Sequence, residues 1–95
     1  MIVGKITGTV VSTKKDELLE GFKFYVVDEV DLNMNPTGKY LIAVDIVGAG
    51  IDEIVLVVQG SSARQSTYTE SKPVDAVVIA IIDSIEVKGE TKYLK

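Results

Sequence analysis

The side chains in this chain that could most readily act in catalysis or bind a metal are carboxylates near the ends of expected β strands. They are Asp45, Asp52, Glu53, Asp75 and Asp83. Paired carboxylates act as acid and base in hydrolysis, or hold Mg²⁺. Nothing in the spacing of these residues brings two of them together, and an aspartate at a strand end commonly accepts hydrogen bonds from turn amides. We therefore expect no catalytic residue and no metal ligand, with a carboxylate-based hydrolase as the enzymatic alternative.

Two short motifs are similar to functional signatures but lack essential residues. Residues 60–64 (GSSAR) have arginine where a nucleophile elbow needs its last glycine. The chain has no histidine and no cysteine, which excludes Ser-His-Asp triads, thiol nucleophiles, disulfides and zinc sites built on either residue. Residues 47–50 (VGAG) precede Glu53, where a dinucleotide-binding fingerprint needs its third glycine. We expect a tight turn with positive φ at Gly48 or Gly50, and no cofactor.

Charge and hydropathy argue against nucleic acid and membranes as partners. Ten basic and 14 acidic residues give a formal net charge of −4, and the basic residues are scattered along the sequence. The longest apolar run is Ala76–Ile82, far short of the roughly 20 residues that span a bilayer. The first residues lack the charge and apolar order of a secretory signal, so we expect a cytoplasmic location.

The composition predicts a β protein, because 15 Val, 10 Ile and 7 Thr place much of the chain in the β-branched class. On its second strand we expect Phe22, Phe24 and Val26 to face inward. A short helical turn is expected at 61–65. The expected strands are residues 2–13, 22–31, 39–46, 53–59 and 76–87, and the tail from residue 88 could add an edge strand.

These strands predict an all-β fold, a small five-stranded antiparallel barrel with a short helical turn, although periodicity alone leaves a sandwich open. Such a barrel resembles the oligonucleotide-binding fold, and an oligonucleotide-binding module is the alternative function. That function needs a basic groove interleaved with stacking aromatics. This chain has two Phe, four Tyr and no Trp, and it is acidic overall. We expect no nucleic-acid partner.

Two of the expected strands are apolar on both faces, which indicates an oligomer. Residues 54–58 and 76–82 are apolar at every position rather than at alternate ones. Strands of this kind are normally covered on both sides. The barrel interior covers one side, and we expect a neighbouring subunit to cover an outward set formed by Val77, Ile79 and Ile81.

Taken in order, the segments of this chain resemble one protein family, the vertex proteins of bacterial microcompartments from ethanolamine-utilisation organelles and carboxysomes. The resemblance covers residues 1 to about 88, treated as a single β-barrel vertex domain, with 89–95 as a C-terminal tail. The segments that carry it are 8–13 (GTVVST), 21–27 (GFKFYVV), 44–53 (VDIVGAGIDE), 60–64 (GSSAR) and 73–83 (PVDAVVIAIID).

The resemblance implies a non-catalytic shell protein without a cofactor. In this family five copies form a ring that closes a vertex of a polyhedral shell, so the expected partners are further copies of the chain and hexameric shell proteins. The implied location is the shell of a cytoplasmic bacterial microcompartment. The resemblance supplies the number five, whereas the apolar strands alone indicate only more than one copy.

The compact run Gly60-Ser61-Ser62 is our candidate for the centre of such a ring. Elements near a symmetry axis approach their own copies closely, which favours small side chains. We expect these three residues to line a narrow axial opening. Arg64, the single arginine, is expected to reach a neighbouring subunit through its forked donors.

Overall fold

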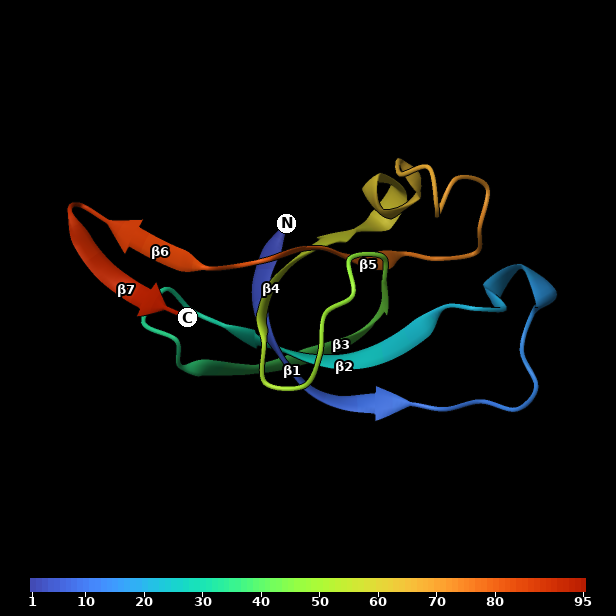
Figure 1. Ribbon diagram of the computed structural model, residues 1–95, viewed down its shortest axis with the longest axis horizontal. Coiled ribbons are helices and arrows are strands. Elements are labelled where there is room, and N and C mark those ends of the chain that lie inside the picture. The colour runs from blue at the N-terminus through green and yellow to red at the C-terminus, as the bar shows by residue number, and fades with distance from the viewer.

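Seven β strands and two short 3-10 helices make up the computed structural model, which describes all 95 residues (Figure 1). The strands are β1 (Ile2–Val10), β2 (Lys23–Val30), β3 (Pro36–Asp45), β4 (Ile54–Gln59), β5 (Ala76–Ile81), β6 (Ser84–Val87) and β7 (Glu90–Leu94). The helices are η1 (Glu17–Leu19) and η2 (Gly60–Arg64), and η2 lies at the expected helical turn. No helix is long and apolar enough to cross a lipid bilayer. The prediction of a β protein is confirmed.

Strands β1 to β5 form a closed barrel in the spatial order β1–β2–β3–β5–β4. The barrel prediction is confirmed, and the sandwich alternative is excluded. Four of the strand pairs are antiparallel, whereas β3 and β5 pair in parallel around Val44 and Val77. The prediction of an entirely antiparallel barrel is therefore wrong at this pair. A closed ring with an odd number of strands cannot alternate direction throughout, so one neighbouring pair must run parallel.

Small and β-branched side chains fill the barrel interior. The residues of this core are Ile6, Tyr25, Val27, Ala43, Ala49, Val55, Val57, Ala76 and Val78. Tyr25 carries the one hydroxyl among them, and this group donates a hydrogen bond to the Ala49 carbonyl at 2.7 Å. The bond satisfies a polar group that burial would otherwise penalise. It also ties β2 to the turn between β3 and β4.

The inner face of β2 differs from the prediction. Tyr25 and Val27 point into the barrel, while Phe22 and Phe24 pack against a separate apolar cluster outside it. Val26 lies on the outer side and is half-buried. The error has a simple cause: this stretch is apolar on both faces, so alternation alone does not select the face that points inward.

The second apolar cluster lies on the outer side of the barrel wall. It is formed by Val44, Ala63, Val74 and Val77. Two of these residues, Ala63 and Val74, come from η2 and the connection between η2 and β5, so residues 60–75 cover part of the outer face of β5. Val77 is fully buried within the single chain. The expectation that a neighbouring subunit covers this position is therefore wrong, because the chain supplies its own cover.

After β5 the chain leaves the barrel as a two-stranded hairpin. The amide of Ile82 donates to the Ile54 carbonyl at 2.8 Å, and Ile54 is the first residue of β4. Strand β4, which pairs with β5, extends no further in this direction, so the predicted strand 76–87 divides into β5 and β6. The expected strand in the tail exists as β7, but it pairs with β6 rather than with the barrel, and residue 88 lies in their turn. The hairpin projects along the long axis of a molecule measuring 45 × 24 × 21 Å (Figure 1).

Candidate functional site

Helix η2, which contains the predicted axial residues, forms an exposed corner on the barrel. Gly60 begins it with φ of +66°, a conformation that favours glycine, and its amide donates to the Asp75 carbonyl at 2.7 Å. Ala63 is buried in the outer cluster and fixes the helix to the barrel wall. Gly60, Ser61 and Ser62 are all exposed. A single chain does not test their distance from a symmetry axis, so the axial position stays a prediction.

Arg64 ends η2 and makes a contact that the sequence did not indicate. Its Nη1 atom donates a hydrogen bond to the Val74 carbonyl at 3.1 Å, which closes the loop that follows η2 onto itself. The residue is nevertheless exposed. The guanidinium has five N–H donors, so one bond inside the chain leaves others for a second contact. Its predicted role at a subunit interface stays a prediction.

The three β5 residues predicted to form one outward face do not share a face. The β4–β5 register shifts between Leu56 and Val57, which inserts Ile79 as an extra residue in β5. A bulge of this kind reverses the alternation beyond it. Val77 and Ile79 consequently pack with the outer cluster, whereas Ile81 packs against the barrel core. Of the three, Ile79 is the one left half-exposed on the outer side.

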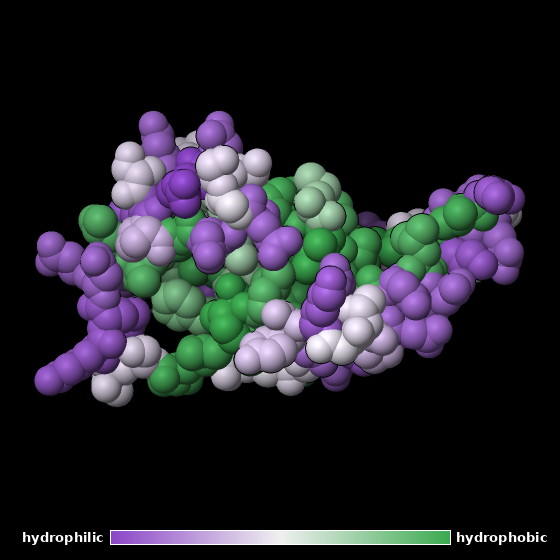
Figure 2. Space-filling view, turned by 180° about the vertical axis from the view of Figure 1, so that it is seen from behind, coloured by the Kyte–Doolittle hydropathy of each residue, from purple (hydrophilic) through white to green (hydrophobic).

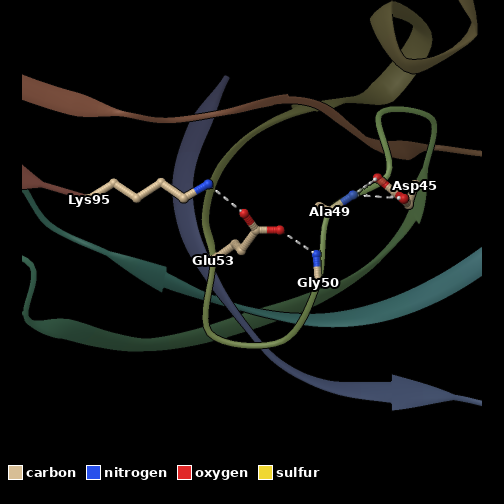
Figure 3. Close-up of polar contacts among 5 residues, drawn as sticks. All are labelled: Asp45, Ala49, Gly50, Glu53 and Lys95. Carbon is tan, nitrogen blue, oxygen red and sulfur yellow. Dashed lines mark hydrogen bonds and ion pairs between the residues drawn. The ribbon is translucent and has the colours of Figure 1, made fainter.

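Asp45 stabilises the turn that carries the VGAG sequence. Its carboxylate accepts hydrogen bonds from the amides of Val47, Gly48 and Ala49 at 3.0–3.3 Å (Figure 3 shows the bonds to Ala49). Gly48 has φ of +77°, which confirms the predicted positive-φ turn. The carboxylate is thus occupied by backbone donors, as expected for an aspartate at a strand end. The arrangement is structural and offers no free acid or base.

Glu53 and Lys95 form an ion pair between parts of the chain that are far apart in the sequence. Lys95 Nζ lies 2.8 Å from Glu53 Oε2, and the second carboxylate oxygen of Glu53 accepts the Gly50 amide at 2.7 Å (Figure 3). The hydrogen bond from Lys95, followed by that from Gly50, holds the pKa of Glu53 below its ordinary value. The same contact raises the pKa of Lys95. No three side chains of metal-ligating type come together anywhere in the chain.

A groove with no counterpart in the sequence predictions lies where β1 and β2 extend beyond the barrel. Its volume is about 370 Å³. It is lined by Thr9, Val10, Val11, Ser12, Lys15, Phe22, Lys23, Phe24 and Tyr25. The signal that could have indicated it is the combination of Val10 and Val11 beyond the barrel with two outward phenylalanines, Phe22 just before β2 and Phe24 within it. None of the predicted site residues lies in this groove.

Comparison with known proteins identifies the family. The model described as ethanolamine utilisation protein EutN/carboxysome matches residues 1–83. The chain belongs to the EutN/CcmL family. Its relative in Synechococcus elongatus, named carboxysome shell vertex protein CcmL, is 46% identical over 95 residues, which cover 100% of this chain and 96% of that protein. The family resemblance predicted from the five sequence segments is therefore confirmed.

Solved structures of EutN/CcmL proteins share the fold. The structure of CcmL from Nostoc superposes with a TM-score of 0.96 at 49% identity, and the match covers 100% of both chains. The structure of GrpN from Rhodospirillum rubrum, described as a pentameric microcompartment shell protein, gives a TM-score of 0.85 at 47% identity. That match covers 92% of this chain and 99% of the GrpN chain. The closed barrel with its projecting hairpin is thus a fold known among EutN/CcmL proteins.

Proposed function

We propose that this chain is a structural shell protein whose homopentamers occupy the vertices of a bacterial microcompartment within the cytoplasm. The observation that carries the proposal is the match over the whole chain to a protein named as a carboxysome shell vertex protein. The similarity to a pentameric shell protein supports five copies in the ring. The serines predicted to lie near the ring centre have no histidine to activate them, because the chain contains none, which agrees with a structural role.

The polar groups of the chain support a function without catalysis. Two of the carboxylates that could have acted in hydrolysis hold a turn or an ion pair: Asp45 binds backbone amides, and Glu53 binds Lys95 and Gly50. The oligonucleotide-binding alternative shares the barrel, but the formal net charge of −4 opposes binding to phosphates. We therefore place the protein among binding and assembly proteins rather than enzymes.

The ring also needs partners in the flat parts of a shell. Five copies with a net charge of −4 each give a formal charge of −20 for the ring. Like-charged rings repel one another, which helps to keep them apart in solution. We propose that the rim of the pentamer contacts hexameric shell proteins through shape and local polar contacts rather than through net charge.

Within the ring we propose that Gly60, Ser61 and Ser62 lie near the five-fold axis. Their exposure, their small size and the anchoring of η2 through buried Ala63 support this position. Arg64 and the half-exposed Ile79 then lie close to a neighbouring subunit. Val77 is left out of this interface, because its side chain is fully buried within its own subunit.

Native mass spectrometry of the purified chain tests the proposal directly. We expect a pentamer at micromolar concentration, and co-purification with a hexameric shell protein when the two are expressed together. A stable monomer at that concentration would contradict the ring. A single-stranded oligonucleotide titrated at low salt serves as the second arm, and tight binding there would favour the nucleic-acid alternative.

A further inference from the structure

A second pocket, of about 240 Å³, shares no residue with the groove described above. It is lined by Ile2, Glu29, Lys39, Tyr40, Leu41 and Gln59, which come from strands β1 to β4. Apolar residues alone do not distinguish a site on this protein, since they extend across much of one face of the molecule (Figure 2). The polar groups of this pocket are what set it apart.

Strand alternation places three polar side chains of the pocket on the inner side of the barrel wall. Glu29 and Gln59 each follow a valine of the barrel core by two residues. Lys39 stands two residues before Leu41, which packs against the same core. Residues two apart on a strand share a face, so these three side chains surround one mouth of the barrel. The mouths of β barrels are among the places where small-molecule sites form.

Glu29 and Lys39 carry opposite charges in this pocket but do not pair with each other. The three ion pairs of the chain involve other residues, so neither group has a charged partner. Gln59, the residue before η2, makes no side-chain hydrogen bond that caps this helix. The pocket thus presents a carboxylate, an ammonium group and an amide to a ligand.

Thr37 holds the Glu29 carboxylate in position. Its hydroxyl donates a hydrogen bond to Glu29 Oε2 at 2.8 Å, and the hydroxyl oxygen accepts the Lys39 amide at 3.3 Å. The second oxygen of the carboxylate remains for a ligand, because an ionised carboxylate can accept hydrogen bonds at both oxygens. Groups that are fixed in this way on strands make a more precise site than groups on loops.

We propose that this pocket binds a small zwitterion with an apolar body, the chemistry of a free aliphatic amino acid. The ammonium group of the ligand donates to Glu29, and its carboxylate accepts from Lys39 and Gln59. Its side chain lies over Ile2 and Leu41, which are half-buried. The pocket is smaller than the roughly 300–1,000 Å³ of sites for drug-sized ligands, which limits the ligand to a small molecule.

A ligand with a single charge fits this pocket less well than a zwitterion. An organic anion brings its charge near the Glu29 carboxylate, and an organic cation brings its charge near the Lys39 ammonium group. Like charges repel at such short range. A zwitterion meets an opposite charge at each end. The inference goes beyond assembly of a shell and does not depend on the number of copies in the ring.

Methyl NMR of the assembled protein tests the site, with L-valine as the probe. Ile2 and Leu41 supply reporter methyl groups within the pocket. Ile51 and Leu94, which are exposed and outside it, supply control methyl groups. We expect saturable shifts of the two reporters and none of the two controls. Reporters that do not shift saturably would overturn the proposal.

Two analogues of valine separate the contributions of its charges. Isovalerate lacks the ammonium group, and isobutylamine lacks the carboxylate. We expect each analogue to bind roughly two- to fivefold more weakly than valine, the range for the loss of an exposed ion pair. If either analogue binds as tightly as valine, the pocket does not recognise a zwitterion, and the proposal is wrong.

Substitutions of the two charged residues assign each contact. Glu29→Gln should weaken valine binding by roughly two- to fivefold without weakening isovalerate binding, because isovalerate has no ammonium group to pair. Lys39→Gln should likewise weaken valine binding without weakening isobutylamine binding. Asp28→Asn is the matched control, since it removes one negative charge from the same strand on the opposite face. An equal effect of Glu29→Gln on valine and isovalerate, or of Asp28→Asn and Glu29→Gln on valine, would overturn the assigned contact.

Discussion

The ammonium group of Lys95 lies 2.8 Å from a carboxylate oxygen of Glu53, so residue 95 is tied to the residue just before β4. The Lys95 amide adds a bond to the Asp83 carbonyl at 2.8 Å, at the base of the hairpin. The two contacts fix where the hairpin leaves the barrel. The Glu53 contact also connects the hairpin to the turn through the Gly50 amide.

The Glu53–Lys95 contact predicts a pH dependence of hairpin order. The pKa of Glu53 is lowered in the folded chain, so its stabilising contribution is present above the ordinary carboxyl pKa and is lost as the pH falls through the lowered value. The pKa of Lys95 is raised, so its contribution is lost only as the pH rises through that raised value. NMR titration should therefore show a low midpoint for Glu53, and lower amide protection factors in β6 and β7 in acid, relative to the intrinsic exchange rate at each pH.

Substitution of Lys95 tests whether this residue causes the lowered pKa of Glu53. In Lys95→Gln the pKa of Glu53 should move up towards its ordinary value, because the charged donor is lost while the Gly50 bond remains. Lys92→Gln is the matched control, since Lys92 pairs with Glu90 rather than with Glu53. An unchanged Glu53 titration in Lys95→Gln would contradict the contact.

Gly4→Ala should destabilise the barrel, because the neighbouring strand β2 approaches β1 closely at this position. A Cβ on Gly4 would overlap the Cγ1 atom of Val27 and lie 3.0 Å from the Asp28 carbonyl oxygen. Both obstacles are rigid, one a buried β-branched side chain and the other backbone. We expect a loss of about 1–3 kcal/mol in the free energy of unfolding, the usual range for overpacking.

Urea denaturation at matched protein concentration measures this loss, since assembly links stability to concentration. Gly8→Ala on the same strand is the control. A Cβ there would meet Val26 at 3.6 Å, an ordinary van der Waals contact. Equal effects of the two substitutions would show that the close approach of β2 at Gly4 does not cause the loss of stability.

Asp45→Ala should destabilise the turn after β3 by about 1.5–3 kcal/mol, the range for hydrogen bonds to a charged group. Its carboxylate accepts hydrogen bonds from three consecutive turn amides, those of Val47, Gly48 and Ala49. Asp75→Ala is the control, because Asp75 is exposed and its side chain makes no hydrogen bond in the chain. Thermal unfolding of the two variants should separate them clearly, and an equal loss in both would contradict the role of Asp45.

The sequence allowed prediction of the strands and of the local turn chemistry, because both depend on neighbouring residues. Asp45 at the end of β3 and Gly48 with positive φ behave as their types and positions indicate. The direction in which side chains point was harder to predict. β2 is apolar on both faces, and the bulge at Ile79 reverses alternation within β5. Neither feature has a signal in hydropathy, since both depend on how strands pair in space.

The cover on the outer face of β5 shows a related limit of sequence reasoning. Apolar residues on both faces correctly indicated that β5 is covered on both sides. They did not distinguish a neighbouring subunit from the chain's own residues 60–75, which bury Val77 through Ala63 and Val74. The groove at the β1–β2 end was missed for the same reason. It forms between two neighbouring stretches, residues 9–15 and 22–25, and hydropathy does not show how the chain reverses between them to bring Val11 close to Phe22.

Ser62→Trp tests the axial position of η2. If η2 lies near the five-fold axis, five indole rings must share a narrow space, and the ring should dissociate or fail to form. The fold of each subunit should persist, because Ser62 is exposed and outside the apolar clusters. Native mass spectrometry measures the number of subunits in the assembly, and circular dichroism measures whether the secondary structure of the fold persists. Thr67→Trp is the control, since Thr67 is also exposed but lies in the loop beyond η2. An intact pentamer of Ser62→Trp would place η2 at the periphery, away from the axis.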